Sequence, residues 1–436
     1  MPNWTKQLSN LKNVRKFKAK KECKNQEVLT KRKMPFFGSA GALIVAVTLI
    51  INSGYYLSTI RDSYLPLILL ILVTGFLAVM TPPRKRVAMN FGNVAPFLLL
   101  FGIGVSAMAN FSLSNILSGG RVAVTMICSY IILVRVDTKQ LLKTYAGLIR
   151  LIILLSALLY ILSSQFSLSF LPTITTSNGA YYNLFLVTQK VSSTARVSGA
   201  FWEPGVFASH IVLSMLFDVY FLKIKAIHVL IYLLGMFITG STAGMLIMLL
   251  VFIGYLLKKT RMSGKKYVEV LFFVLIVIGI LSYESVFSLL SSISPKFFSK
   301  LMDTDSSTFF TRMNSPLVNL ELFAEKPLFG WGFTDAATQY SLRMDTKLVA
   351  QTSTSTQIMS AIGILGIVYT LLCLSPLFSK KRLSHLSLMD KGIISASLLL
   401  LVNKEPHIFF AITWLTLFLV ARSSGNENGE SVCNSA

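Results

Sequence analysis

Apolar runs recur along this 436-residue chain, and short polar connections separate them. A run of about 20 apolar residues can cross a bilayer as a helix, and a somewhat shorter run can do so within a packed bundle. The sequence therefore predicts an all-α integral membrane protein with about 12 transmembrane helices. The expected spans are 37–57, 64–81, 94–111, 122–134, 145–166, 206–222, 226–238, 243–257, 267–287, 357–378, 392–402 and 408–421.

Composition agrees with this fold class, because 53% of the residues are hydrophobic and only 14% are charged. A formal net charge of +23 is also typical of nucleic-acid binders. Here, however, lysine and arginine crowd the N-terminal tail and the connections, as topology signals do, so we expect no nucleic-acid partner. The four cysteines show no disulfide or zinc spacing, and no nucleotide or hydrolase motif occurs, so we expect no metal and no cofactor.

The basic residues also predict an orientation. If the N-terminus lies in the cytoplasm, nearly all lysine- and arginine-rich connections fall on the cytoplasmic side. Residues 1–36 then form a basic cytoplasmic tail, 37–421 a single polytopic membrane domain, and 422–436 a second cytoplasmic tail. Two long connections, 167–205 and 288–356, lie outside the cytoplasm, and we expect short helices within them.

The first long connection ends in three candidate functional residues. Arg196 precedes a turn rich in glycine and proline near membrane level, where its guanidinium group suits bidentate phosphate binding. It could equally extend toward the interface as a snorkelling side chain or pair with Glu203. Glu203 is a candidate general base or a structural partner of Arg196. The neighbouring Trp202 is a candidate for substrate binding.

The second long connection carries Arg312 shortly before a predicted helix. Ser315 followed by Pro316 predicts an N-cap and a first helical position, and the helix should continue for about two to three turns. Its apolar side, which includes Leu317, would rest on the bundle or in the membrane interface. Arg312 could clamp a pyrophosphate together with Arg196, or could simply be solvated.

A rigid turn follows that predicted helix. Pro327 fixes one backbone dihedral, and Gly330 and Gly332 permit left-handed geometry or close backbone approach. Trp331 could stack on a sugar or anchor the loop at the interface. We treat Lys326, Gly330, Trp331 and Gly332 as candidate substrate-binding residues.

The polar interruption between the last two predicted spans holds Lys404, Glu405 and His407. His407 is a weaker candidate acid or base, because its ordinary pKa lies near neutrality. Other titratable residues within or at the ends of spans form neither a proton relay nor a metal motif.

In these residues and in its pattern of apolar runs, the chain resembles the bacterial Wzy-type O-antigen and exopolysaccharide polymerases and the related O-antigen ligases. The resemblance covers most of the chain as a hydropathy pattern and includes several short motifs in the same order. These are Arg196-x-Ser198-Gly199-x-Phe201-Trp202-Glu203-Pro204-Gly205, Ser241-Thr242-Ala243-Gly244, Arg312 ahead of Lys326-Pro327-Leu328-Phe329-Gly330-Trp331-Gly332, and Ala361-Ile362-Gly363-Ile364-Leu365-Gly366.

The resemblance implies a glycosyltransferase of the bacterial cytoplasmic (inner) membrane with its active site on the extracytoplasmic face. Such a polymerase moves a growing glycan from undecaprenyl diphosphate to a new lipid-linked repeat unit, using no nucleotide sugar. The family's loop arginines, thought to bind the pyrophosphate, correspond to Arg196 and Arg312. The implied partners are undecaprenyl-diphosphate-linked oligosaccharide and membrane lipid, with a chain-length regulator and a flippase as possible protein partners.

One departure bears on the type of transfer. Ligases carry a histidine motif before the span that follows the second long connection, whereas this chain reads Thr352-Ser353-Thr354-Ser355-Thr356-Gln357. The departure favours a polymerase over a ligase. It also leaves undecided which residue deprotonates the acceptor hydroxyl; Glu203 is the first candidate and His407 the second. A repeat-unit flippase is the alternative from a different class, and the absence of an evident internal repeat weighs against it.

Overall fold

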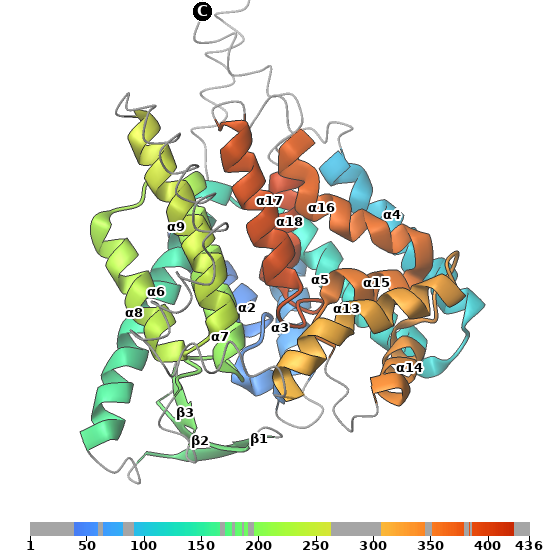
Figure 1. The fold of residues 1–436 in the computed structure, drawn as a ribbon, viewed down its shortest axis with the longest axis horizontal. Helices are drawn as coiled ribbons and strands as arrows, with labels where there is room; N and C mark the ends of the chain where they lie inside the picture. Colours follow the sequence, from blue (N-terminus) through green and yellow to red (C-terminus); the bar gives the residue numbers. More distant parts are fainter. Residues whose placement is uncertain are drawn as a thin grey trace, which may run out of the picture.

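The computed structural model describes most of the predicted membrane domain as a helical bundle (Figure 1). The described residues are 39–59, 64–81, 91–165, 171–176, 179–184, 187–190, 196–262, 307–344, 351–378, 383 and 386–422. Its α-helices are α2 Ser39–Ile51, α3 Leu65–Met80, α4 Phe91–Ala109, α5 Leu113–Arg135, α6 Thr138–Gln165, α7 Pro204–Tyr220, α8 Ala226–Thr239, α9 Thr242–Met262, α13 Ser307–Glu325, α14 Phe333–Met344, α15 Thr354–Ile362, α16 Ile367–Phe378, α17 Leu388–Val402 and α18 Ala411–Arg422. Two 3₁₀ turns, η2 Tyr56–Thr59 and η3 Gly363–Gly366, complete the helical elements.

The apolar helices confirm a mostly helical membrane protein. Within the described ranges, five helical stretches are long and apolar enough to cross a membrane, and five shorter apolar helices accompany them. The five long stretches are Phe91–Ala109, Leu113–Arg135, Thr138–Ser163, Thr242–Thr260 and Thr354–Phe378. The predicted span 267–287 lies outside the described residues, so the total of about 12 spans stays a prediction.

Two helices are longer than their apolar runs indicate. The connection 135–144 was predicted to be polar, yet α6 begins at Thr138 and includes Lys139 and Lys143. Helix α9 continues to Met262, past the predicted end of its span at 257. Lysine and threonine are tolerated in helices, so a helix continues beyond the apolar segment that crosses the membrane.

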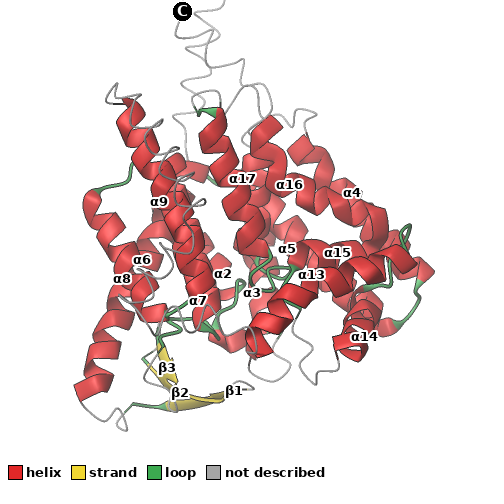
Figure 2. Cartoon of the chain, in the orientation of Figure 1, coloured by secondary structure: helices red, strands yellow, loops and turns green. Residues whose placement is uncertain are grey.

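The described part of the first long connection contains a β-sheet, so the prediction of short helices is wrong for those residues (Figure 2). Strands β1 Thr173–Thr176, β2 Gly179–Asn183 and β3 Thr188–Lys190 pair antiparallel in the order β1-β2-β3. Threonine and tyrosine dominate β1 and β2, and both residue types favour extended backbone. Hydrogen bonds join the sheet to the segment before α7, from Tyr181 Oη to the Trp202 carbonyl at 3.2 Å and from the Thr188 amide to the Gly199 carbonyl at 2.7 Å.

Helix α13 corrects the predicted helix of the second long connection. It begins at Ser307, so Arg312 lies inside it and Pro316 is an interior residue. Proline lacks only its own amide hydrogen, so the helix continues with one backbone hydrogen bond missing. Its buried face carries Ser315, Asn319 and Leu322.

The predicted apolar side of α13 does not pack on the bundle. Leu317 is 57% exposed and Leu320 is 40% exposed. These two residues therefore do not rest on the bundle, and a location in the membrane interface stays a prediction.

Helices α7 and α18 form the centre of the bundle. Every residue of α7 from Gly205 to Tyr220 is buried, as is every residue of α18 from Ala411 to Ala421. Proline is favoured at the first helical position, which explains why α7 begins at Pro204. The segments that precede the two helices both hydrogen-bond to the turn after α2. The Trp202 amide donates to the Gly54 carbonyl, and the Ala411 amide donates to the Asn52 carbonyl. Both central helices therefore begin at the same end of the bundle, near the sheet.

Candidate functional site

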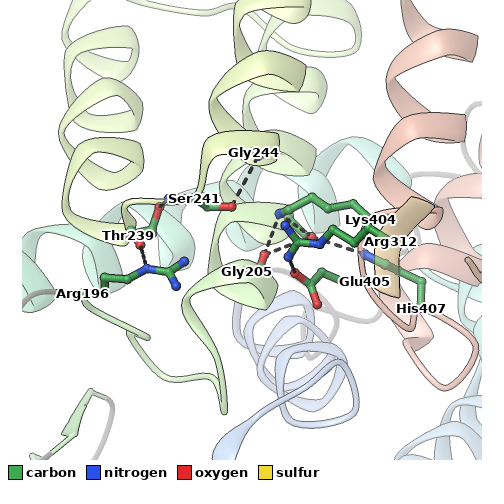
Figure 3. Close-up of polar contacts among 10 residues, drawn as sticks. Arg196, Gly205, Thr239, Ser241, Gly244, Arg312, Lys404, Glu405 and His407 are labelled. Atoms are coloured by element: carbon green, nitrogen blue, oxygen red, sulfur yellow. Dashed lines mark hydrogen bonds and ion pairs between the residues drawn. The ribbon is translucent and has the colours of Figure 1, made fainter. Parts of the chain in front are cut away.

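Arg196 lies against the C-terminal end of α8 (Figure 3). The adjacent Val197 amide donates to the Ile238 carbonyl at 3.0 Å, which fixes the backbone at this point. Arg196 Nε donates to the Thr239 carbonyl at 3.0 Å. The last carbonyls of a helix carry partial negative charge and stabilise a nearby cation. This contact holds Arg196 beside Gly240 and the segment Ser241–Gly244, which is one of the short motifs quoted above.

Arg312 forms an ion pair with Glu405, which belongs to the segment between α17 and α18. Arg312 Nη2 lies 3.2 Å from Glu405 Oε1. The Arg312 side chain is 33% exposed, whereas the Glu405 side chain is only 5% exposed. The Arg312 side chain therefore stays partly exposed while it neutralises a buried carboxylate.

Glu405 Oε1 packs directly on the first turn of α7. A Cβ atom added to Gly205 would lie 2.0 Å from this oxygen, so glycine is required here. The N-terminus of a helix carries partial positive charge, which favours the carboxylate at this position. Gly205 thus allows a buried negative charge to sit at the start of α7.

Lys404 is buried beside the same turn. Its Nζ donates to the Gly205 carbonyl at 2.8 Å and lies 3.5 Å from Ser209 Oγ. Burial lowers the pKa of the Lys404 ammonium to about 8; the Glu405 charge opposes this shift, and the charges of Arg312 and Arg196 add to it. Lys404 therefore carries a positive charge at neutral pH and loses it in mildly alkaline solution.

These side chains form one charge cluster, which we define as Arg196, Glu203, Arg312, Lys404 and Glu405. Burial lowers the pKa of Arg196; the positive charge of Arg312 lowers it further, and the charges of Glu405 and Glu203 oppose the shift. In Figure 3 the Arg196 guanidinium group points toward the Arg312 and Glu405 side chains. With three cations and two carboxylates, the cluster has one excess positive charge at neutral pH and is suited to an anion with several oxygens.

Glu203 and Trp202 lie at the edge of the cluster in different environments. Glu203 is exposed at the N-cap position of α7. The indole ring of Trp202 is partly buried, with its centroid 5.6 Å from that of Phe410. The structure places Glu203 where an external molecule can reach it and packs Trp202 against the segment before α18.

His407 is fully buried, and its role as an acid or base stays a prediction. Its Nδ1 lies 2.8 Å from Thr413 Oγ1 and its Nε2 lies 3.3 Å from Ser209 Oγ. Burial holds its pKa well below the usual value, and the neighbouring His210 and Lys404 lower it further. His407 therefore links the start of α18 to α7 through these two contacts.

The predicted substrate-binding turn is used for packing. Trp331 Nε1 donates to the Leu322 carbonyl at 3.0 Å, and Lys326 Nζ lies 3.8 Å from the centroid of the Trp331 ring. Lys326 Nζ also donates to Asn110 Oδ1 at 3.1 Å. These contacts fix the C-terminal end of α13, the helix that carries Arg312, against the end of α4.

Gly330 and Gly332 have structural reasons for being glycine. Both have positive φ, +67° and +79°. A Cβ on Gly330 would lie 2.4 Å from the Ala361 carbonyl, and one on Gly332 would lie 2.6 Å from the Asn115 side chain. The turn is therefore held against α15 and α5, and its glycines allow this close packing.

Lys404 and Glu405 are the site residues that the sequence did not single out. The sequence placed them only as neighbours of His407, although a charged pair between two apolar runs is itself a signal of function. The segment Thr352–Thr356 holds them in place. Ser355 Oγ donates to Asn403 Oδ1, and the His407 amide donates to Thr354 Oγ1 at 2.8 Å.

No protein-family model matched this chain, and no curated protein matched it either. The resemblance to the Wzy-type polymerases therefore rests on the motifs and on their order along the chain.

Proposed function

We propose that this protein is a polysaccharide polymerase of the bacterial cytoplasmic membrane. It transfers a growing O-antigen, capsular or exopolysaccharide chain from undecaprenyl diphosphate to a lipid-linked repeat unit on the extracytoplasmic face. The observation that supports the proposal is that the Arg196 guanidinium group points toward Arg312 and that the charge of Arg312 acts on it. These are the two residues that correspond to the pyrophosphate-binding arginines of the resembled family, and they come from different long connections.

The cluster suits the chemistry of this transfer. A hydroxyl oxygen of the acceptor sugar attacks the anomeric carbon of the donor glycan, and the bond from that carbon to the phosphate oxygen breaks. The departing diphosphate keeps the electron pair, so negative charge develops on it. Two guanidinium groups aimed at this charge stabilise the transition state more than the ground state. Lys404 adds a third positive charge, which acts on both arginines.

Glu203 is the proposed acceptor for the proton of the attacking hydroxyl. Its carboxylate is exposed at the start of α7 and contributes to the electrostatic environment of Arg196. In this scheme the β-sheet, the segment before α7 and α13 lie outside the cytoplasm, as the positive-inside pattern predicts. A chain-length regulator and a repeat-unit flippase are the proposed protein partners.

The direct test is a gel of the glycan chains made by a strain in which the only copy of this protein carries Arg312→Ala. Removing one donor that stabilises developing charge commonly slows a reaction by about 10² to 10³ fold, so the long rungs should disappear. Arg343→Ala is a matched control, because Arg343 pairs with Glu325 on an exposed surface. A full ladder from Arg312→Ala at normal protein level would refute the role of Arg312.

The same gel separates the polymerase from the ligase. Loss of a polymerase leaves single repeat units on the lipid core, whereas loss of a ligase leaves none. Purified protein supplied with radiolabelled lipid-linked repeat units excludes a pure flippase if chains grow without a membrane gradient.

A further inference from the structure

Glu405 is a buried negative charge that lies between Arg312 and the first turn of α7. Oε1 of Glu405 is 3.2 Å from Arg312 Nη2 and rests against Gly205 on its other side. The carboxylate is almost fully buried, so bulk water and salt screen it poorly. Among the described residues, the buried Nε of Arg312 has no hydrogen-bond partner, so this carboxylate is the acceptor that holds the guanidinium group.

A carboxylate in this place weakens the binding of every anion to the two arginines, because it repels the anion's negative charge. By Coulomb's law the penalty grows with the charge of the anion. If the protein acts as proposed above, the donor is a diphosphate diester with two negative charges. The product, undecaprenyl diphosphate, has a free terminal phosphate and carries close to three. A site made only of cations would therefore hold its product more tightly than its substrate.

We infer that Glu405 is the residue that drives release of the diphosphate product, by competing with it for Arg312. This inference rests on the proposed function and adds a role to the same site. When the glycan has moved to the acceptor, the extra charge on the leaving diphosphate is opposed by the buried carboxylate. Arg312 then returns to the ion pair with Glu405, and the product departs.

The position of Glu405 supports this role over a purely structural one. The ion pair also stabilises the fold, but the Arg312 side chain is 33% exposed and its charge acts on a second arginine, so it stays within reach of a bound anion. Lys404 already joins the same segment to α7 through the Gly205 carbonyl. Glu405 instead lies where its charge reaches Arg312, Arg196 and Lys404 together.

The test compares two small anions by titration calorimetry on the purified full chain in non-ionic detergent near neutral pH. Methyl diphosphate is the product analogue, and P1,P2-dimethyl diphosphate is the substrate analogue. We expect Glu405→Gln to bind both analogues more tightly. Its affinity for the product analogue should rise by about tenfold more than its affinity for the substrate analogue, because the product analogue carries one further charge. Equal gains for the two analogues, or no gain, would overturn the inference.

A turnover measurement adds an independent readout. We expect later rounds of transfer by Glu405→Gln to be slower than its own first round, because release becomes limiting. Equal slowing of the first and later rounds would indicate a structural role. Glu325→Gln is the matched control, since it removes an exposed ion pair with Arg343 and should change neither measurement.

Failure of the inference can be told apart from failure of the proposed function. If Arg312→Ala and Arg196→Ala leave the binding of both analogues unchanged, the diphosphate site itself is wrong. If both arginines matter but Glu405→Gln shows no preference for the product analogue, only the inference fails. Should Glu405→Gln not fold, Glu405→Asp withdraws the charge by one methylene and should show the same preference to a smaller extent; no preference there would also refute it.

Discussion

Replacing Gly205 by alanine should destabilise the protein through the buried charge of Glu405. The new Cβ would lie 2.0 Å from Glu405 Oε1 and 2.8 Å from its carboxyl carbon, whereas real Cβ atoms almost never approach closer than 3.0 Å. The carboxylate must therefore move away from the first turn of α7. That movement disrupts its 3.2 Å contact with Arg312 and leaves a charge that is 5% exposed with a weaker partner.

The size of the effect follows from two opposing contributions. Removing one partner of a buried ion pair costs about 3 to 5 kcal/mol. Here both partners remain and Arg312 is partly exposed, so we expect about 3 kcal/mol. Alanine in a helix is more favourable than glycine by about 1 kcal/mol. The net loss should be about 2 kcal/mol, and the melting temperature should fall by roughly 4 °C.

The assay is thermal unfolding of the purified protein in detergent, compared with Gly104→Ala in α4. An added Cβ on Gly104 meets nothing within 4 Å, so this control should gain up to about 1 kcal/mol from helix propensity. If Gly205→Ala is as stable as Gly104→Ala, the buried carboxylate moves without cost and the reasoning is wrong.

Two further variants test other parts of the site. Because burial lowers the pKa of Lys404 to about 8, the cluster loses one positive charge above that pH, and binding of P1,P2-dimethyl diphosphate should weaken as the pH rises through it. Lys404→Met should bind this anion more weakly at neutral pH, and calorimetry should show that its affinity no longer falls as the pH rises. If the affinity of Lys404→Met still falls with pH, a group other than Lys404 causes the pH dependence. Gly330→Ala should lower stability by about 2 kcal/mol, because φ is +67° and its Cβ would lie 2.4 Å from the Ala361 carbonyl. The folded Gly330→Ala protein should bind the same anion normally, and weakened binding would show that this turn contacts the substrate.

The sequence predicted the helical membrane fold because hydrophobic composition and span length act locally along the chain. It was less accurate where a helix contains polar residues. Ser315 and Pro316 suggested the start of a helix and placed Arg312 before it, yet α13 passes through all three. The β-sheet was missed because short threonine- and tyrosine-rich strands give a weak signal beside long apolar helices.

The site divides in the same way. The sequence by itself identified Arg196 and Arg312, because a cation in a polar segment beside an apolar span is unusual wherever that segment folds. It could not show that Arg312 pairs with Glu405, because the two residues are 93 positions apart and nothing local links them. Nor could it show that His407 is buried or that Gly330 is held against α15. Only the tertiary structure decided these points, since the partners of a side chain depend on which helix ends meet.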